Sequence, residues 1–362
     1  MNVLKLVAMA VGFIFVAGAL MSAIRTVVLP RGVRSRVARL LFGGVLILLR
    51  LVARAQTSFA SRDSTLALVA PIGLLLLPVA WTVMTWFGYS LWFWAAGVDP
   101  LADAMTLSGS SLLTLGFARP VGAVQTVLTF TEAMFGLGLI ALLIAYLPSM
   151  YNAFNRREAS VALLAVRAGD PPTAVEMLTR FHRIGWLDQL DPLWAHWEEW
   201  FADVDESHTS LGALIFFRSP VRTRSWITAA GTVLDAASLQ VSTLAGGASP
   251  QAQVCIRAGY VALRRICDLV GIEYDPDPRP DDPISISREE FDEVCVQLHD
   301  NGLTLVADLD QAWLDYAGWR VNYDTVLLGL AALVTAPFTP WTSDRSPIGG
   351  FRSRLLAGPD IR

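Results

Sequence analysis

Residues 104–120, AMTLSGSSLLTLGFARP, are the stretch around which the rest of the chain is organised. The middle is rich in Ser, Thr and Leu, and it leads into Thr114-Leu115-Gly116-Phe117-Ala118. A long apolar segment precedes this stretch, and another follows it to residue 147. Apolar runs of about 20 residues or more predict membrane-spanning helices.

The stretch resembles the pore helix and selectivity filter of potassium channels, whose filter consensus is T-V-G-Y-G followed by Asp. Thr114, Gly116 and the aromatic Phe117 fall in register with that consensus, and Leu115 takes the place of Val. The resemblance covers residues 64–155, less than half of the chain. It implies a homotetramer in which backbone carbonyls replace the hydration shell of a permeant K⁺ or Na⁺ ion.

Two residues depart from the consensus. Ala118 replaces the last filter glycine, and in a left-handed conformation it would cost about 1–2 kcal/mol per subunit. Arg119 replaces the acidic residue, so a fourfold assembly would place four positive charges near the outer mouth. One hypothesis is that Arg119 pairs with Asp99, Asp103 or Glu132; the other is a solvated arginine. Selectivity for K⁺ is expected to be altered or weakened.

The residues around the filter receive supporting roles from the same resemblance. Ser111 and Glu132 are expected to support the filter, and Asp103 to cap the pore helix, since an aspartate accepts from the free N–H groups of a first turn. A carboxylate such as Glu132 is costly in lipid and normally faces protein or water. Gly136 and Gly138 are candidates for a gating hinge, with simple helix packing as the equal alternative.

The N-terminal half of the chain predicts the membrane topology. Residues 2–24 are long enough to span a bilayer, and the dense arginine cluster that follows favours a retained span over a cleaved signal peptide. That cluster belongs in the cytoplasm, so the N-terminus is expected outside the cell membrane. Residues 64–97 form the expected outer helix, and Pro148 is expected to end the inner helix at the cytoplasmic surface.

Residues 37–60 allow two interpretations. Arg39, Arg50 and Arg54 make one basic stripe beside an apolar face, which favours an amphipathic helix lying in the inner interface on anionic lipid. The alternative is a further span with snorkelling arginines. A pore loop that enters from outside is consistent with the interfacial helix.

The remaining residues, from 157 onward, predict an all-helical cytoplasmic domain. Residues 1–150 carry a net charge of +6 and residues 151–362 a net charge of −10, as expected for two regions with different solvents. Asp170, Ser249 and Ser287 are placed to begin helices, and Gly185, Gly271 and Gly302 to end them. A tetratricopeptide-like hairpin over residues 159–185 is a weaker prediction.

The sequence contains no pattern that argues for an enzyme, a metal site or a cofactor. The cysteines and histidines lack metal-ligand spacing, and the three cysteines, all in the second half, are expected to be reduced core thiols. The tryptophans of residues 194–200 are expected to form a packed core or a subunit interface. Nucleic acid is not an expected partner, and the ligand of the cytoplasmic domain cannot be named from sequence.

We therefore predict an all-α membrane protein with five regions: an N-terminal transmembrane helix (1–28), an Arg-rich loop and interfacial helix (29–62), a potassium-channel-like pore domain (63–155), a helical cytoplasmic domain (156–336) and a tail (337–362). The predicted function is a homotetrameric cation channel. The alternative is a non-conducting, channel-derived membrane sensor or scaffold whose cytoplasmic domain carries the function.

Overall fold

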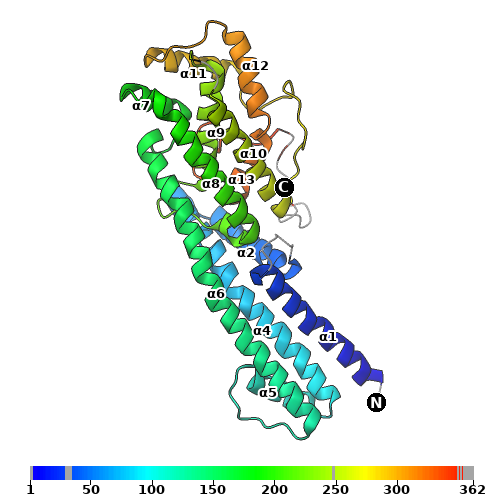
Figure 1. Cartoon of the computed structure of the whole chain (residues 1–362). Helices are drawn as coiled ribbons and strands as arrows, with labels where there is room; N and C mark the ends of the chain where they lie inside the picture. Colours follow the sequence, from blue (N-terminus) through cyan, green and yellow to red (C-terminus); the bar gives the residue numbers. More distant parts are fainter. Residues whose placement is uncertain (1–2, 29–34, 247–248, 349, 351–352, 354–362) are drawn as a thin grey trace. The chain divides into compact units, whose positions relative to one another are not determined.

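The computed structural model describes the chain except for residues 1–2, 29–34, 247–248, 349, 351–352 and 354–362. The described residues fold into helices joined by loops, with isolated bridges and no strands (Figure 1). The predicted all-α fold class is therefore confirmed. The chain divides into two compact units. The first comprises Met1–Ala55 and Leu68–Asn152, and the second Gln56–Ala67 and Ala153–Arg362.

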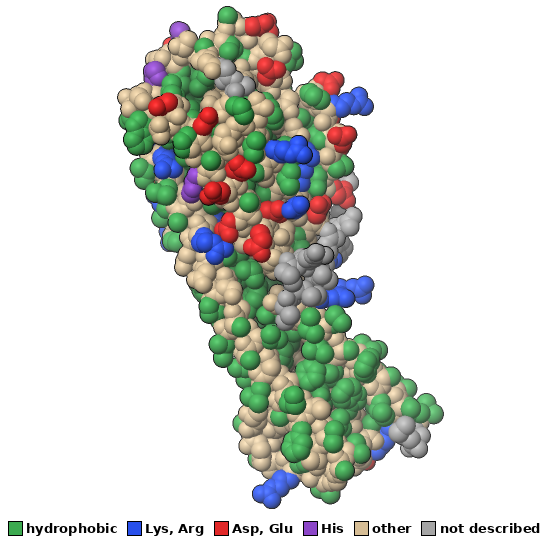
Figure 2. Space-filling view, viewed as in Figure 1, with side chains coloured by type: hydrophobic (Ala, Val, Ile, Leu, Met, Phe, Trp, Pro, Cys, Tyr) green, Lys and Arg blue, Asp and Glu red, His purple; other side chains and the backbone are tan. Residues whose placement is uncertain are grey.

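Three helical segments are long and apolar enough to cross a membrane: Val3–Val27, Phe59–Ala95 and Ala123–Ala168. Figure 2 agrees, because on the face shown apolar side chains dominate the surface of the first unit, whereas acidic and basic side chains are spread over the second. An exposed apolar surface of this extent is typical of a protein that faces lipid. The chain is a membrane protein with an N-terminal helix of spanning length, as predicted.

The first unit is built on the helices α1 (Val3–Ala23), α2 (Arg36–Arg54), α4 (Val69–Ala95) and α5 (Leu101–Leu112), together with the first part of α6 (Ala123–Ala168). α1 packs along α4, and α5 and α2 also pack on α4. A Cβ atom on Gly12 of α1 would lie 2.7 Å from the carbonyl oxygen of Gly88 on α4. The two backbones approach this closely because glycine occupies both positions, a common device in helix pairs within membranes.

The predicted outer helix of residues 64–97 is interrupted near its start. The short helix α3 (Phe59–Leu66) ends in a turn, and α4 begins at Val69. Pro71 explains the interruption, because its ring would clash with the carbonyl of residue 67 in a continuous helix. Pro78, by contrast, lies inside α4, which continues through it.

Two sequence predictions of helix ends are wrong. α6 does not stop at Pro148 but runs through it to Ala168. One proline removes a single backbone hydrogen bond, and the residues that follow are rich in strong helix formers. Asp170 does not cap the next helix, α7 (Ala174–Arg183); Thr173 does, with its hydroxyl accepting from the Glu176 N–H. Asp170 instead pairs with Arg224 at 3.3 Å.

Most of residues 37–60 lie in the helix α2 (Arg36–Arg54), which is capped by Ser35, and α3 begins at Phe59. The helix α2 is not among the three segments that qualify as spans. Its apolar face includes the buried Phe42, Val45 and Leu46. Arg39 is partly buried, and Arg54 is exposed. The amphipathic helix is therefore present in the structure; its position on lipid stays a prediction.

The second unit surrounds α9 (Trp226–Thr243), most of whose residues are buried. The other main helices are α8 (Leu190–Ser210), α10 (Pro250–Val270), α11 (Arg288–Asp300), α12 (Leu309–Arg320) and α13 (Asp324–Val334), with short turns at Leu187–Gln189 and Gly212–Phe216. α7, α10, α12 and α13 all pack on α9. Several predicted boundaries are confirmed: Ser249 caps α10, Gly271 ends it at a φ of 70°, and Ser287 with Glu290 forms the capping box of α11.

The buried side chains of the second unit agree with two further predictions. Trp194, Trp197 and Trp200 are buried in the core. Cys255, Cys267 and Cys295 are free and buried, as expected for reduced core thiols.

Gly185 follows the end of α7 with a φ of 71°, as predicted for a residue that ends this helix. The predicted hairpin of residues 159–185 corresponds to the end of α6 and the helix α7.

Candidate functional site

The candidate site is the segment that joins α5 to α6, residues 113–122, together with the two helix ends beside it. α5 begins after Pro100, which makes no side-chain capping bond. Asp103 is therefore not the cap that the sequence predicted; it lies inside the first turn. A carboxylate there still interacts favourably with the positive end of the helix dipole.

The loop is tied to the C-terminal turn of α5 through its amide groups. The N–H groups of Leu115 and Gly116 both donate to the carbonyl oxygen of Ser110, at 2.8 and 3.2 Å. The N–H of Ala118 donates to the Ser110 hydroxyl at 3.1 Å. Ser110 therefore organises the loop, a role that sequence analysis did not assign to it.

The carbonyl groups of the same loop behave differently from its amides. Within the described chain, no hydrogen bond reaches the carbonyl oxygens of Thr114, Leu115, Gly116 or Phe117, nor the Thr114 hydroxyl. All four residues are exposed in the single chain. Unpaired backbone carbonyls are costly away from water, so these oxygens require another partner wherever the loop is buried. The predicted coordinating atoms are thus free of internal partners.

Left-handed backbone, which strains residues other than glycine, occurs in the loop at Thr114 and not at Ala118, where the sequence predicted it. Thr114 has a φ of 54° and Gly116 a φ of 72°, whereas Ala118 is not in the left-handed region. The expected penalty at Ala118 is therefore absent, and a β-branched residue bears the strain. Left-handed backbone at a threonine is rare and costs on the order of 1–3 kcal/mol, and such strain concentrates at functional sites.

A buried polar cluster holds α5 against α4 and α6. The Ser108 hydroxyl lies 2.5 Å from Glu132 Oε1 and 3.0 Å from the carbonyl oxygen of Trp86. Ser111 donates to the carbonyl oxygen of Thr129 at 2.8 Å. Glu132 is completely buried. Both predicted support residues therefore contact the α5–α6 interface, with Ser108 as the direct partner of the carboxyl group.

Several polar atoms near this cluster have no protein partner. Among the described residues, Glu132 Oε2 and the hydroxyls of Thr85 and Thr129 are buried without a hydrogen bond. Buried polar groups are nearly always hydrogen-bonded to protein or water.

Arg119 does not make any of the ion pairs considered from sequence. Its side chain is exposed, and within the described chain it forms no salt bridge with Asp99, Asp103 or Glu132. Asp99 instead pairs with Lys5 at 3.1 Å. The solvated arginine is the interpretation that fits.

The two candidate hinge glycines differ sharply. A Cβ atom on Gly136 would lie 2.2 Å from the carbonyl oxygen of Leu112, so α6 passes directly against the end of α5. A Cβ atom on Gly138 would meet nothing within 4 Å. Gly136 also lines a hollow of about 170 Å³ with Thr82, Thr114 and Leu143. Gly136 is thus a packing position, and Gly138 has open space around it.

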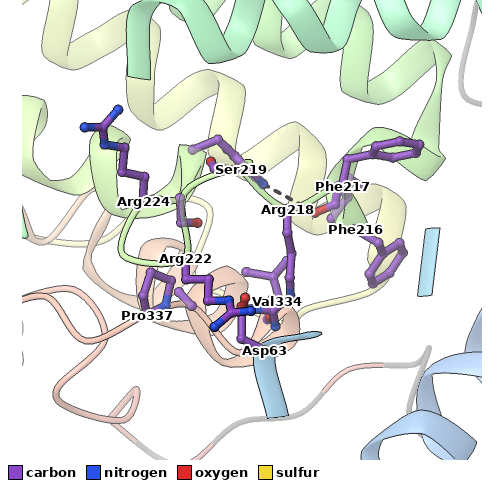
Figure 3. A pocket seen from close by; sticks show the side chains of 13 residues that line it. Asp63, Phe216, Phe217, Arg218, Ser219, Arg222, Arg224, Val334 and Pro337 are labelled. Carbon is purple, nitrogen blue, oxygen red and sulfur yellow. Dashed lines mark hydrogen bonds and ion pairs between the residues drawn. The ribbon is translucent and has the colours of Figure 1, made fainter. Parts of the chain in front are cut away.

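The second unit contains a surface hollow that sequence analysis missed. Arg218 pairs with Asp63 of α3 at 2.5 Å and donates to the carbonyl oxygens of Val334 and Thr335. In Figure 3, Arg218 and Arg222 reach toward Asp63, whereas Arg224 points away from it. Burial lowers the pKa of Arg218, and the Asp63 carboxylate opposes that shift. The ion pair between Arg218 and Asp63 therefore connects α3 to the rest of the second unit.

A buried ionic cluster in the second unit was also missed. Arg320 pairs with Asp235 at 2.5 Å and with Asp324 at 2.7 Å, and all three side chains are buried. Only the i,i+4 spacing of Arg320 and Asp324 is visible in the sequence. Asp235 is far away in the chain, so no local pattern could have identified it.

Comparison of the chain with protein-family models, with curated proteins and with solved structures gave no match. Among the described residues, no group of three or more His, Cys, Asp or Glu side chains could hold a metal ion. The fold and the site together define a multi-helical membrane protein with a helix–loop–helix element in its apolar unit.

Proposed function

We propose that the chain is one subunit of a homotetrameric cation channel. The observation that carries the proposal is the loop of residues 114–117, whose amides fold back on Ser110 while its carbonyls remain without internal partners. A single loop offers oxygens from one side only. Four copies around an axis would surround a permeant ion with the carbonyls of Thr114 to Phe117 and the Thr114 hydroxyl, in place of its hydration shell.

The polarity of α5 supports a cation. The C-terminal end of a helix carries a partial negative charge, and α5 ends at Leu112, directly before the loop. Four such helix ends would stabilise a cation beside Thr114. Ser108, Ser111 and Glu132 would hold α5 in this position through the buried cluster.

Arg119 is the main reason to expect weakened K⁺ selectivity. It is exposed at the far end of the loop and lacks a carboxylate partner. Four guanidinium groups near the mouth would lower the local cation concentration, an effect that salt screens over about 10 Å at 0.1 M. We propose the cell membrane as the location, with the N-terminus outside, the second unit in the cytoplasm and α2 on anionic lipid through Arg39, Arg50 and Arg54.

The decisive experiment measures reversal potentials of the purified protein in planar bilayers, first under a KCl gradient and then with K⁺ opposed to Na⁺. Reversal near the potassium potential supports a K⁺-preferring channel, and a current that ignores the K⁺/Na⁺ difference supports a non-selective cation pore. Reversal near the chloride potential contradicts cation conduction. Arg119→Gln should raise cation conductance most at low salt, with Arg62→Gln as a control outside the loop.

A non-conducting sensor or scaffold is the competing function, favoured by the unpaired Arg119 and by Ala118 at a position that the filter consensus gives to glycine. The double variant Ala118→Gly, Arg119→Asp separates the two functions. Current in the double variant alone would show that the native loop does not conduct and would favour the scaffold. Current in the wild-type protein would exclude it.

A further inference from the structure

The second unit contains a cavity of about 300 Å³, and all of its lining residues belong to that unit. Its walls come from the N-terminus of α7, from α9, from α11 and from the segment 340–345. Four carboxylates line it, Asp235, Glu290, Glu293 and Asp344, against one guanidinium, Arg345. Trp341 contributes an indole ring to the wall. A volume near 300 Å³ is at the lower end of the range for small-molecule sites.

Some charged side chains of the cavity wall have ion-pair partners within the protein, and others do not. Arg345 is fully engaged: it makes two bonds with Glu290, at 3.0 and 2.8 Å, two with Asp344, at 2.9 and 3.0 Å, and one with the carbonyl oxygen of Ser285. Glu293 is exposed and has no hydrogen bond or ion pair among the described residues. The α7 N-terminus is positive, but Glu176 already lies in its first turn. The unbalanced charge of the cavity is therefore negative.

Asp235 adds a buried part to this imbalance. Its Oδ1 accepts from Arg320 at 2.5 Å, from Tyr323 at 3.0 Å and from Tyr316 at 3.5 Å, while no hydrogen bond to Oδ2 is found among the described residues. The single guanidinium group of Arg320 forms ion pairs with two buried carboxylates, Asp235 and Asp324. With both carboxylates ionised the cluster would carry one excess negative charge in the interior, and burial raises the pKa of Asp235 because its charged form is costly there. Such a charge is costly unless it is neutralised or paired.

We propose that this cavity binds a small organic cation, of the class of aliphatic amines, with its ammonium group at Asp235 Oδ2. Glu293 would hold a second positive group at the rim, and the Trp341 ring would contact the cation or its carbon chain, as indole rings do. The volume exceeds the need of a bare metal ion, and the lining offers an aromatic wall. This inference is independent of ion conduction.

The test uses the full chain in detergent or nanodiscs and titrates 1,4-diaminobutane by calorimetry at constant ionic strength. Butane-1,4-diol, a neutral molecule of similar length, is the matched probe. We expect saturable binding of the diamine and none of the diol. Removal of a charged hydrogen-bond partner should weaken binding about tenfold or more in Asp235→Asn.

A second variant, at Glu293, tests the proposal if Asp235→Asn does not fold. Glu293→Gln should weaken diamine binding severalfold, whereas Glu289→Gln, an exposed carboxylate of the same helix outside the cavity, should not change it. Absence of saturable binding to the wild-type protein, equal binding of the diol, or equal effects of the Glu293 and Glu289 substitutions would each overturn the proposal. Because the readout is heat, the result does not depend on whether the protein conducts.

Discussion

Ser108 on α5 and Glu132 on α6 meet through Oγ and Oε1 atoms 2.5 Å apart, inside the apolar unit. The Ser108 hydroxyl has one proton but lies near two acceptors, the Glu132 carboxyl and the carbonyl oxygen of Trp86. A protonated Glu132 would donate to Ser108, which could then donate to Trp86. A neutral carboxyl group satisfies the contact better than a carboxylate does, and it avoids a buried charge.

This relationship predicts the order of three substitutions. Glu132→Gln keeps a donor near Ser108 and should be tolerated, whereas Glu132→Ala removes the contact and leaves a cavity, at a cost of about 2–4 kcal/mol. Ser108→Ala should cost about 1–3 kcal/mol by leaving the carboxyl group without its partner. Thermal unfolding in one detergent gives the ranking. If Glu132→Gln were as damaging as Glu132→Ala, the neutral form would not be the one that the fold requires.

Gly136 and Gly138 form a matched pair of helix positions. Gly136→Ala should destabilise the protein by about 1–3 kcal/mol, because the new Cβ would lie 2.2 Å from the Leu112 carbonyl and would force α5 and α6 apart. Gly138→Ala meets open space and should be neutral or stabilise by up to about 1 kcal/mol, since alanine favours the helix. Unfolding temperatures of the two variants test this, and similar losses would contradict the assigned packing role.

Glu290 predicts a pH dependence of stability in the second unit. Hydrogen bonds from Arg345 hold the pKa of Glu290 below its ordinary value, so the ion pair stabilises above the unfolded pKa and is lost as the pH falls through the folded pKa. Because Glu290 is partly exposed, the gain should stay below about 1 kcal/mol. Thermal unfolding should show the difference in stability between wild type and Glu290→Gln shrinking as the pH falls from about 5 to about 3.

Glutamine preserves the capping box at this position, so the Glu290 substitution isolates the ion pair. Glu289→Gln, at an exposed residue of the same helix, is the control and should show no comparable narrowing of the difference. A difference for Glu290→Gln that stays constant over this pH range would mean that the Arg345 pair does not contribute.

The three cysteines should resist modification in the folded protein. Burial raises the pKa of Cys295 to about 11 and the pKa of Cys255 and Cys267 further, so little thiolate is present at neutral pH. An aromatic disulfide reagent should react slowly with the native protein and fully after denaturation. Rapid reaction of any thiol in the native protein would contradict the buried environment.

Local signals in the sequence were sufficient to predict helices that begin and end within a few residues. Ser249 before Pro250 and Gly271 after Val270 define α10 in the sequence as they do in the structure. The prediction failed at Pro148, where the proline was expected to end the helix, and at Asp170, which was expected to cap the helix that Thr173 caps. In both places the competing signal was a good helix former or a capping hydroxyl nearby.

The candidate site was predictable only in its location. The register of Thr114, Gly116 and Phe117 pointed to the loop, and burial of Glu132 followed from the cost of a carboxylate in lipid. Two features depend on distances between elements and could not be predicted. Ser110 binds three loop amides, and Gly136 lies so close to Leu112 that a Cβ atom would not fit. The same holds for Arg320 and Asp235, which lie 85 residues apart. No periodicity carries such information.

The pairing of Asp63 with Arg218 has a consequence for how the protein is made. The two residues are 155 positions apart, and the short segment 56–67 belongs to the second unit although it precedes α4 in the chain. A ribosome would release α3 long before its partner exists. Asp63 therefore lacks its counter-ion until Arg218 has been synthesised, and the Val334 carbonyl that also binds Arg218 follows later still. A fragment that starts after α6 would always lack this piece of its own surface.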